Sequence, residues 1–133
     1  MSEVTALPGH GEVNAELVDA VLGEAAKFAQ EVLDPLNREG DKQGSRLADG
    51  KVTTPPGFKE AYAAFIEAGW TALTGPEYAG GQDMPQSLGA ACKEMLDGAN
   101  LAWSNFSLLS HGVIEALKLH GEDWQKEAFL RKL

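Results

Sequence analysis

The sequence of 133 residues predicts an all-α domain, a helical bundle of about five helices. Three observations indicate this class. Apolar residues recur at helical spacing over most of the chain, helix-capping residues precede several of these stretches, and glycine or proline separates them. The length suits one domain, which we expect to cover residues 14–133 after a flexible N-terminal segment at residues 1–13.

The first helix is expected to begin after Asn14, a favourable N-cap residue, and to end before Pro35. The residue before a proline avoids helical backbone, which is the reason for this boundary. Residues 37–53 are polar and contain glycine. Within them, Asp49-Gly50 predicts a turn that fits either a short hairpin or an irregular loop.

The second helix is expected to open at Thr54-Pro55, with threonine as its cap, and to stop at Gly69. The glycines and the proline of residues 74–82 predict a loop without regular structure.

The third helix is expected to start at Pro85 and to be interrupted at Gly98 and Asn100. A long fourth helix is expected over residues 101–120, with Gly121 as its cap. The fifth should begin at residues 122–123, where two acidic residues complement the helix dipole. This last helix ends on an apolar residue in mid-pattern, which indicates that the chain is part of a longer one.

Composition excludes several classes of function. The net charge of −9 disfavours binding to nucleic acid, and no apolar run approaches the ~20 residues needed to span a membrane. The N-terminus lacks the features of a signal peptide. Cys92 is the only cysteine, which precludes an intrachain disulfide and suits a reducing, cytoplasmic location. Its small, apolar neighbours predict a buried residue and not a nucleophile.

Motifs that carry catalysis or bind metals are absent from the sequence, which has no nucleotide-binding glycine loop, serine nucleophile elbow or zinc-binding helix. His111 and Glu115 are four residues apart on one helix face, but no second pair completes a metal site. A local hydrogen bond or a solvated pair explains them better. We therefore expect no catalytic residue and no metal in this chain.

The fourth helix has two distinct faces. Trp103, Phe106, Val113 and Leu117 form a stripe that we expect to enter the core. A second face is small and polar, and it includes Ser104, Ser107 or Leu108, and His111. Such a face permits either close packing of another helix or a cavity that a ligand enters, and the residues alone favour packing.

Three passages, taken in order, resemble the N-terminal domain of acyl-CoA dehydrogenases. They lie within residues 68–82, 94–102 and 120–133, and their most recognisable parts are Ala68-Gly69-Trp70, Pro76-Glu77-Tyr78-Ala79-Gly80-Gly81-Gln82, Asn100-Leu101-Ala102 and His120-Gly121-Glu122. Residues 32–41 and 53–59 are similar to the branch of that family that contains 3-methylmercaptopropionyl-CoA dehydrogenase.

The resemblance implies a reaction for a full-length parent. A glutamate base would remove an α-proton from an acyl-CoA, and a hydride would pass from the β-carbon to FAD, as in fatty acid metabolism. The family's β-domain and C-terminal helical domain, which supply most flavin contacts and the base, lie outside this chain. The chain alone is therefore expected to be inactive and without FAD, and its cofactor-binding residues are unknown. The complete protein is expected to form a homo-oligomer.

The resemblance also implies substrate-binding residues. The family's helix that matches residues 101–120 lines the fatty-acyl tail, and by position Ser104, Asn105, Leu108, Leu109 and Gly112 fall on the acyl-pocket wall. The expected partners are the acyl-CoA substrate and the remaining domains of the same chain. The alternative from another functional class is a free-standing helical interaction module without enzymatic activity.

Overall fold

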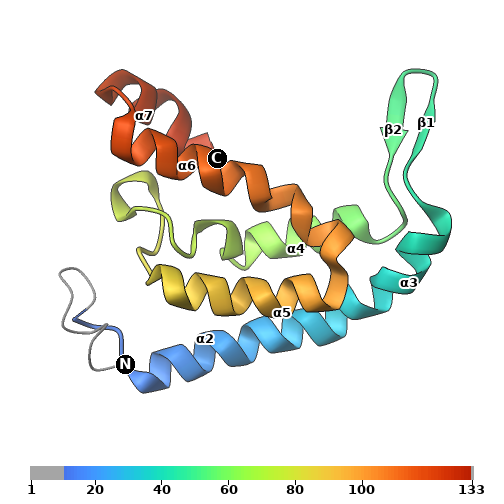
Figure 1. Ribbon diagram of the computed structural model, residues 1–133, viewed down its shortest axis with the longest axis horizontal. Coiled ribbons are helices and arrows are strands. Elements are labelled where there is room, and N and C mark those ends of the chain that lie inside the picture. Colours follow the sequence, from blue (N-terminus) through green and yellow to red (C-terminus); the bar gives the residue numbers. More distant parts are fainter. Residues whose placement is uncertain (1–10, 133) are drawn as a thin grey trace.

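Helices dominate the computed structural model, which describes residues 11–132 and confirms the all-α class. Residues 1–10, most of the expected flexible segment, lie outside the described residues, as does Leu133. Two helices, α2 (Ala15–Phe28) and α5 (Gln86–Ser104), lie side by side, with α4 (Phe58–Glu67) and α6 (Leu108–His120) stacked beyond them (Figure 1). None of the helices in the described part of the chain combines the length and apolarity needed to cross a membrane.

The N-terminal helix begins as predicted but does not end at Pro35. The side chain of Asn14 accepts a hydrogen bond of 2.9 Å from the Leu17 amide. Helical backbone then continues through a π-helical segment, η1 (Ala29–Leu33), into α3 (Asp34–Gln43). Pro35 is tolerated because it lies in the first turn of α3, where its missing amide proton is not required. The π turn before it shifts the hydrogen-bond pattern at this junction.

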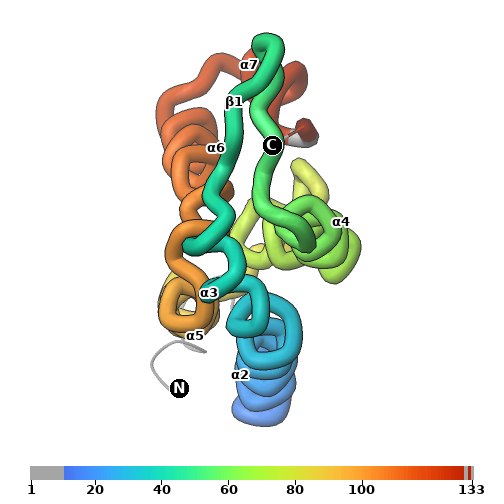
Figure 2. Tube along the Cα trace, turned by 90° about the vertical axis from the view of Figure 1, so that its right-hand side faces the viewer, coloured from blue at the N-terminus to red at the C-terminus, as the bar shows by residue number. Residues whose placement is uncertain are grey.

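A β-hairpin follows α3 and projects away from the helices (Figures 1 and 2). Its strands, β1 (Arg46–Ala48) and β2 (Lys51–Thr53), are antiparallel. Asp49 and Gly50 form the turn with φ of 50° and 72°, as two-residue hairpins require. Of the two predicted alternatives, the hairpin is therefore correct. The first part of the polar segment, residues 37–43, is helical and not irregular.

The second predicted helix starts later than expected. Thr54 and Pro55 precede α4, whose N-cap is Gly57 with a left-handed φ of 85°. A Cβ atom at Gly57 would come within 2.5 Å of Leu36 Cδ2, so this glycine lets the chain turn closely past α3. The predicted stop at Gly69 is confirmed by its φ of 78°. Two short 3₁₀ turns follow, η2 (Trp70–Ala72) and η3 (Glu77–Ala79), the second within the predicted loop.

The predicted interruption at Asn100 is confirmed, whereas Gly98 lies in undisturbed helix. Asn100 has non-helical φ and ψ of −157° and 85°, and its buried side chain forms two hydrogen bonds. Its Oδ1 accepts from the Trp103 amide at 3.1 Å, and its Nδ2 donates to the Leu33 carbonyl at 3.3 Å. Asn100 therefore ties the kink of α5 to the π-helical segment.

The prediction of one long fourth helix over residues 101–120 is wrong. Its first residues form the last turn of α5, a 3₁₀ turn η4 (Asn105–Ser107) follows, and only then does α6 begin. Hydroxyl groups explain the break. Ser107 donates to the Ser104 carbonyl and Ser104 to the Leu101 carbonyl, both at 3.2 Å, and such bonds compete with the helix ladder.

The C-terminal part of the described chain agrees with prediction. Helix α6 ends at Gly121, whose amide donates to the Leu117 carbonyl at 2.9 Å. Helix α7 (Asp123–Phe129) starts with a capping box formed by Glu122 and Gln125, and η5 (Leu130–Lys132) follows it.

Two adjoining clusters of buried side chains form the core, one around Trp103 and the other around Cys92. Trp103 is 2% exposed, as predicted, but Phe106 is 49% exposed and Val113 is also exposed, so their assignment to the core is wrong. The turn η4 changes the direction of the chain between these residues, so the predicted stripe is not continuous in space. Cys92 is buried as predicted, and burial raises the pKa of its thiol.

Candidate functional site

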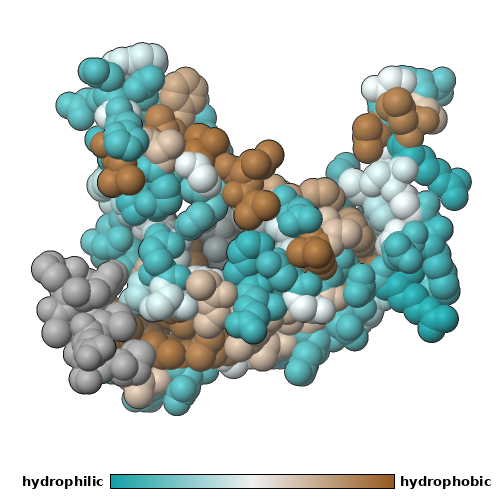
Figure 3. All heavy atoms as spheres, in the orientation of Figure 1, coloured by the Kyte–Doolittle hydropathy of each residue, from teal (hydrophilic) through white to brown (hydrophobic). Residues whose placement is uncertain are grey.

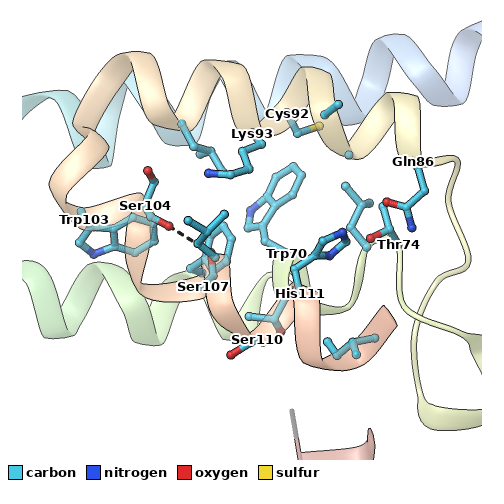
Figure 4. A pocket seen from close by; sticks show the side chains of 18 of the residues that line it. Trp70, Thr74, Gln86, Cys92, Lys93, Trp103, Ser104, Ser107, Ser110 and His111 are labelled. Carbon is cyan, nitrogen blue, oxygen red and sulfur yellow. Dashed lines mark hydrogen bonds between the residues drawn. The ribbon is translucent and has the colours of Figure 1, made fainter. Parts of the chain in front are cut away.

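A cavity of about 280 Å³ lies between α4, η2, α5 and α6 (Figure 4). Most of its wall is apolar or aromatic, including Tyr62, Phe65, Trp70, Leu96, Trp103 and Leu108. Its polar lining includes Thr74, Gln86, Lys93, Ser104, Ser107 and His111. This mixture of an apolar wall with a few polar groups is typical of small-molecule sites.

Three aromatic rings hold one side of the cavity in place. Phe65 stacks on Trp70 with ring centroids 6.5 Å apart and an angle of 21° between the rings. The same Phe65 meets Trp103 edge-on at 5.3 Å. The Trp103 indole is fixed in turn by a hydrogen bond of 3.1 Å from its Nε1 to the Phe58 carbonyl. Because the rings brace one another, this wall is preformed.

A polar cluster on α5 borders the same cavity. Lys93 Nζ lies 2.7 Å and 3.0 Å from the two carboxylate oxygens of Asp97, one helical turn away. The hydroxyl of Ser104 donates to Asp97 Oδ1 at 2.6 Å. Burial acts to raise the pKa of Asp97, but the hydrogen bonds from Lys93 and Ser104 and the Lys93 charge outweigh it, so this pKa is lowered. The charge of Lys93 is therefore neutralised by a carboxylate that stays ionised.

The five residues predicted for the pocket wall lie in three different places. Ser104 and Leu108 line the cavity. Leu109 and Gly112 lie instead in a shallow depression on another face of α6, and Asn105 lines neither surface. Ser104 is only 3% exposed and binds Asp97, so its side chain is committed to holding α5 as well as to lining the cavity.

Sequence reasoning missed several lining residues. Trp70 belongs to a passage that carries the family resemblance, yet nothing in that passage indicated where its ring points. The spacing of Lys93 and Asp97, four residues apart on a helix, was the available signal for their ion pair. His111 and Ser107, which the sequence placed on the small and polar face of the fourth helix, do line the cavity. Residues 11–132 contain no group of three or more side chains that could hold a metal ion.

The arrangement is suited to binding a small molecule. Among the described residues, no carboxylate lines the cavity. The cavity also does not fit a flavin dinucleotide. Lys93 is the one lysine or arginine in the described wall of the cavity, and it is already paired with Asp97. No lysine or arginine of this wall is therefore left to bind the flavin's pyrophosphate. What the cavity can accept is a small, largely apolar group.

Comparisons with known proteins point to one family. The family described as the acyl-CoA dehydrogenase N-terminal domain matches residues 16–133. The 3-methylmercaptopropionyl-CoA dehydrogenase of Ruegeria pomeroyi is 37% identical over 131 residues, which is 98% of this chain and 22% of that protein. A butyryl-CoA dehydrogenase of Syntrophomonas wolfei is 33% identical over 87% of this chain and 19% of its own length.

A broad-specificity linear acyl-CoA dehydrogenase of Mycobacterium tuberculosis is 34% identical over 71% of this chain and 16% of its own length. The chain thus spans about a fifth of the length of the curated relatives it matches. The match covers almost all of the described residues, including every element that borders the cavity. The chain belongs to the family of acyl-CoA dehydrogenase N-terminal domains.

Proposed function

We propose that this domain supplies part of the acyl-pocket wall of a flavin-dependent acyl-CoA dehydrogenase, a cytoplasmic oxidoreductase. The parent enzyme would convert an acyl-CoA thioester to the enoyl-CoA, with FAD as electron acceptor. The observation that carries this proposal is the preformed apolar cavity between α4, α5 and α6. Its volume of about 280 Å³ is just below the usual range for ligand pockets, which favours a short acyl tail.

The reacting groups belong to other parts of the parent in this proposal. The cavity has no carboxylate in its described wall and no fit for FAD, so both the base and the flavin are assigned to the remaining domains. The domain alone should then be inactive. Exposed apolar residues lie on α6, α7 and the hairpin (Figure 3). In this proposal the remaining domains, or another subunit of a homo-oligomer, would cover this apolar surface.

Leu108 offers the sharpest test of the pocket assignment, because it lines the cavity and is 49% exposed. We expect Leu108→Trp in the full-length enzyme to fill space that a longer tail needs. Pocket discrimination per methylene is about 1–3 kcal/mol, so the ratio of kcat/KM for a longer over a shorter acyl-CoA should fall roughly tenfold or more per excluded methylene. Steady-state kinetics over a series of straight-chain acyl-CoAs measures this ratio.

The adjacent residue provides the matched control. Leu109 has the same side chain and is 81% exposed, but it lies on the face of α6 that does not border the cavity. Leu109→Trp should leave the chain-length profile unchanged. If both variants shift the profile equally, or if neither does, the cavity is not the acyl pocket. Ser104 is a poorer choice, since enlarging so buried a residue would disturb packing as well.

A further inference from the structure

Asp97 binds two residues of the cavity wall although it does not line the cavity itself. Its two carboxylate oxygens lie 2.7 Å and 3.0 Å from Lys93 Nζ, and Oδ1 also accepts a hydrogen bond of 2.6 Å from the Ser104 hydroxyl. Both partners line the cavity and both belong to α5 (Figure 4). One carboxylate therefore fixes the position of an ammonium group and of a hydroxyl group at the cavity surface.

The contact between Asp97 and Ser104 crosses the kink of α5 at Asn100. Side chains three or four residues apart are neighbours on a regular helix, whereas these two residues are seven apart. Ser104 is also buried, so its hydrogen bond holds the carboxylate at one place instead of leaving it to move among exposed rotamers. The arrangement of Lys93 and Asp97 is thus more constrained than an ordinary ion pair along an exposed helix.

This carboxylate decides the charge that a ligand meets in the cavity. Lys93 is the one lysine or arginine in the described part of the wall, and Asp97 neutralises it through two contacts. An acyl tail with a carboxylate at its end would have to compete with Asp97 for the same ammonium group. Like charges at short range repel, and the cost rises as water is excluded. An uncharged tail meets no such repulsion.

We infer that Asp97 is a specificity-determining residue that acts through Lys93: by neutralising this ammonium group, it prevents the cavity from accepting acyl groups with an anionic end. The inference rests on the proposed function and assigns the choice between neutral and acidic tails to a residue outside the cavity wall. Without the charge of Asp97, Lys93 would present an unpaired ammonium group, which binds a carboxylate through a charge-assisted hydrogen bond.

The test uses the full-length enzyme and two substrates of similar shape, adipyl-CoA and 6-methylheptanoyl-CoA, whose tails end in a carboxylate and in an isopropyl group. Asp97→Asn keeps an oxygen that can accept from Ser104 but removes the charge. The ratio of kcat/KM for the acidic over the neutral substrate should rise about two- to tenfold, the effect of a partly screened charge pair. A purely structural role would lower kcat/KM for both substrates alike and leave this ratio unchanged.

Lys93→Met should change the same ratio in the opposite direction, because it leaves the Asp97 carboxylate unpaired beside the cavity. The double variant Lys93→Met/Asp97→Asn should restore a ratio close to that of the wild type, since neither charge of the pair remains. His111 also lines the cavity, but it is common to all these variants, so its contribution cancels in the comparison.

Glu115→Gln is the matched control variant. Glu115 Oε1 lies 3.0 Å from Lys118 Nζ in a second ion pair, and neither residue of that pair lines the cavity. The substitution changes the net charge of the protein as much as Asp97→Asn does. The substrate ratio of Glu115→Gln should nevertheless equal that of the wild type.

An unchanged ratio in Asp97→Asn, or an equal rise in Glu115→Gln, would overturn the inference. If Asp97→Asn does not fold, Lys93→Met decides alone: a lower ratio supports the inference, and an unchanged or higher ratio refutes it. The proposed function is tested separately, by the chain-length profile of Leu108→Trp with uncharged substrates. A shifted profile together with an unchanged charge ratio would therefore remove only the inference about Asp97.

Discussion

Trp103 connects three parts of the chain through one side chain. Its ring contacts Phe28, Tyr62 and Phe65 at centroid distances of 6.1, 6.2 and 5.3 Å, and its Nε1 donates to the Phe58 carbonyl. The tryptophan thereby joins α2 and α4 to the end of α5. It also backs the cavity wall, so the stability of the fold and the shape of the site depend on the same residue.

We predict that Trp103→Ala lowers the free energy of unfolding by about 3–5 kcal/mol, the usual loss on truncating a buried aromatic residue. Phe106→Ala is the control, because Phe106 is half-exposed and makes one edge-on ring contact with Phe58 at 6.2 Å. Phe106→Ala should lower the free energy of unfolding much less. Urea denaturation followed by circular dichroism measures both, and equal losses in the two variants would contradict this account of the core.

At the scale of elements, two glycines should respond to alanine in opposite ways. Gly57 has a left-handed φ and its added Cβ would meet Leu36, so Gly57→Ala should destabilise the domain by about 1–2 kcal/mol or more. Gly98 lies inside α5 with no atom within 4 Å of an added Cβ, so Gly98→Ala should stabilise it by about 0.5–1 kcal/mol. Thermal melting of both variants measures the shifts, and two shifts of the same sign would refute the local geometry described above.

The same elements indicate how far sequence can predict this fold. Local signals were sufficient at Asn14, at Gly69, at the Asp49-Gly50 turn and at the start of α7, because capping and turn chemistry act within a few residues. They failed at Pro35, where a π turn allowed the helix to continue. They also failed at the break before α6, where serine hydroxyls donate hydrogen bonds to backbone carbonyls.

Only part of the candidate site could be predicted from the sequence, because the chain turns just before α6. The family resemblance indicated a region that borders the cavity, but the predicted residues were chosen on a continuous helix. The turn η4 rotates the wall, so Ser104 and Leu108 reach the cavity while Leu109 and Gly112 face elsewhere. Trp70 and Lys93 come from other elements, and only the packing of η2 and α5 against α6 brings them to the same space.

At the scale of the whole molecule, the domain has a well-packed half and an exposed half. Both buried clusters include residues of α5 packed against the N-terminal helical segment, and one of them also includes α4, whereas α6 has no fully buried residue. The hairpin likewise leaves Leu47 and Val52 exposed as a cross-strand pair. Together with the one-fifth coverage of the relatives, this distribution is consistent with an N-terminal domain that packs against further parts of a longer chain.

The most direct test of the central claim, that the cavity receives the acyl tail, is photolabelling of the full-length enzyme. An acyl-CoA with a diazirine at the end of a short chain would be irradiated in the complex, and the labelled residues located by tandem mass spectrometry. We predict labels on cavity residues such as Trp70, Lys93 and Leu108, suppressed by excess unlabelled substrate. Substrate-protected labels found only on Leu109 and its neighbours in the shallow depression, or only outside this domain, would contradict the claim.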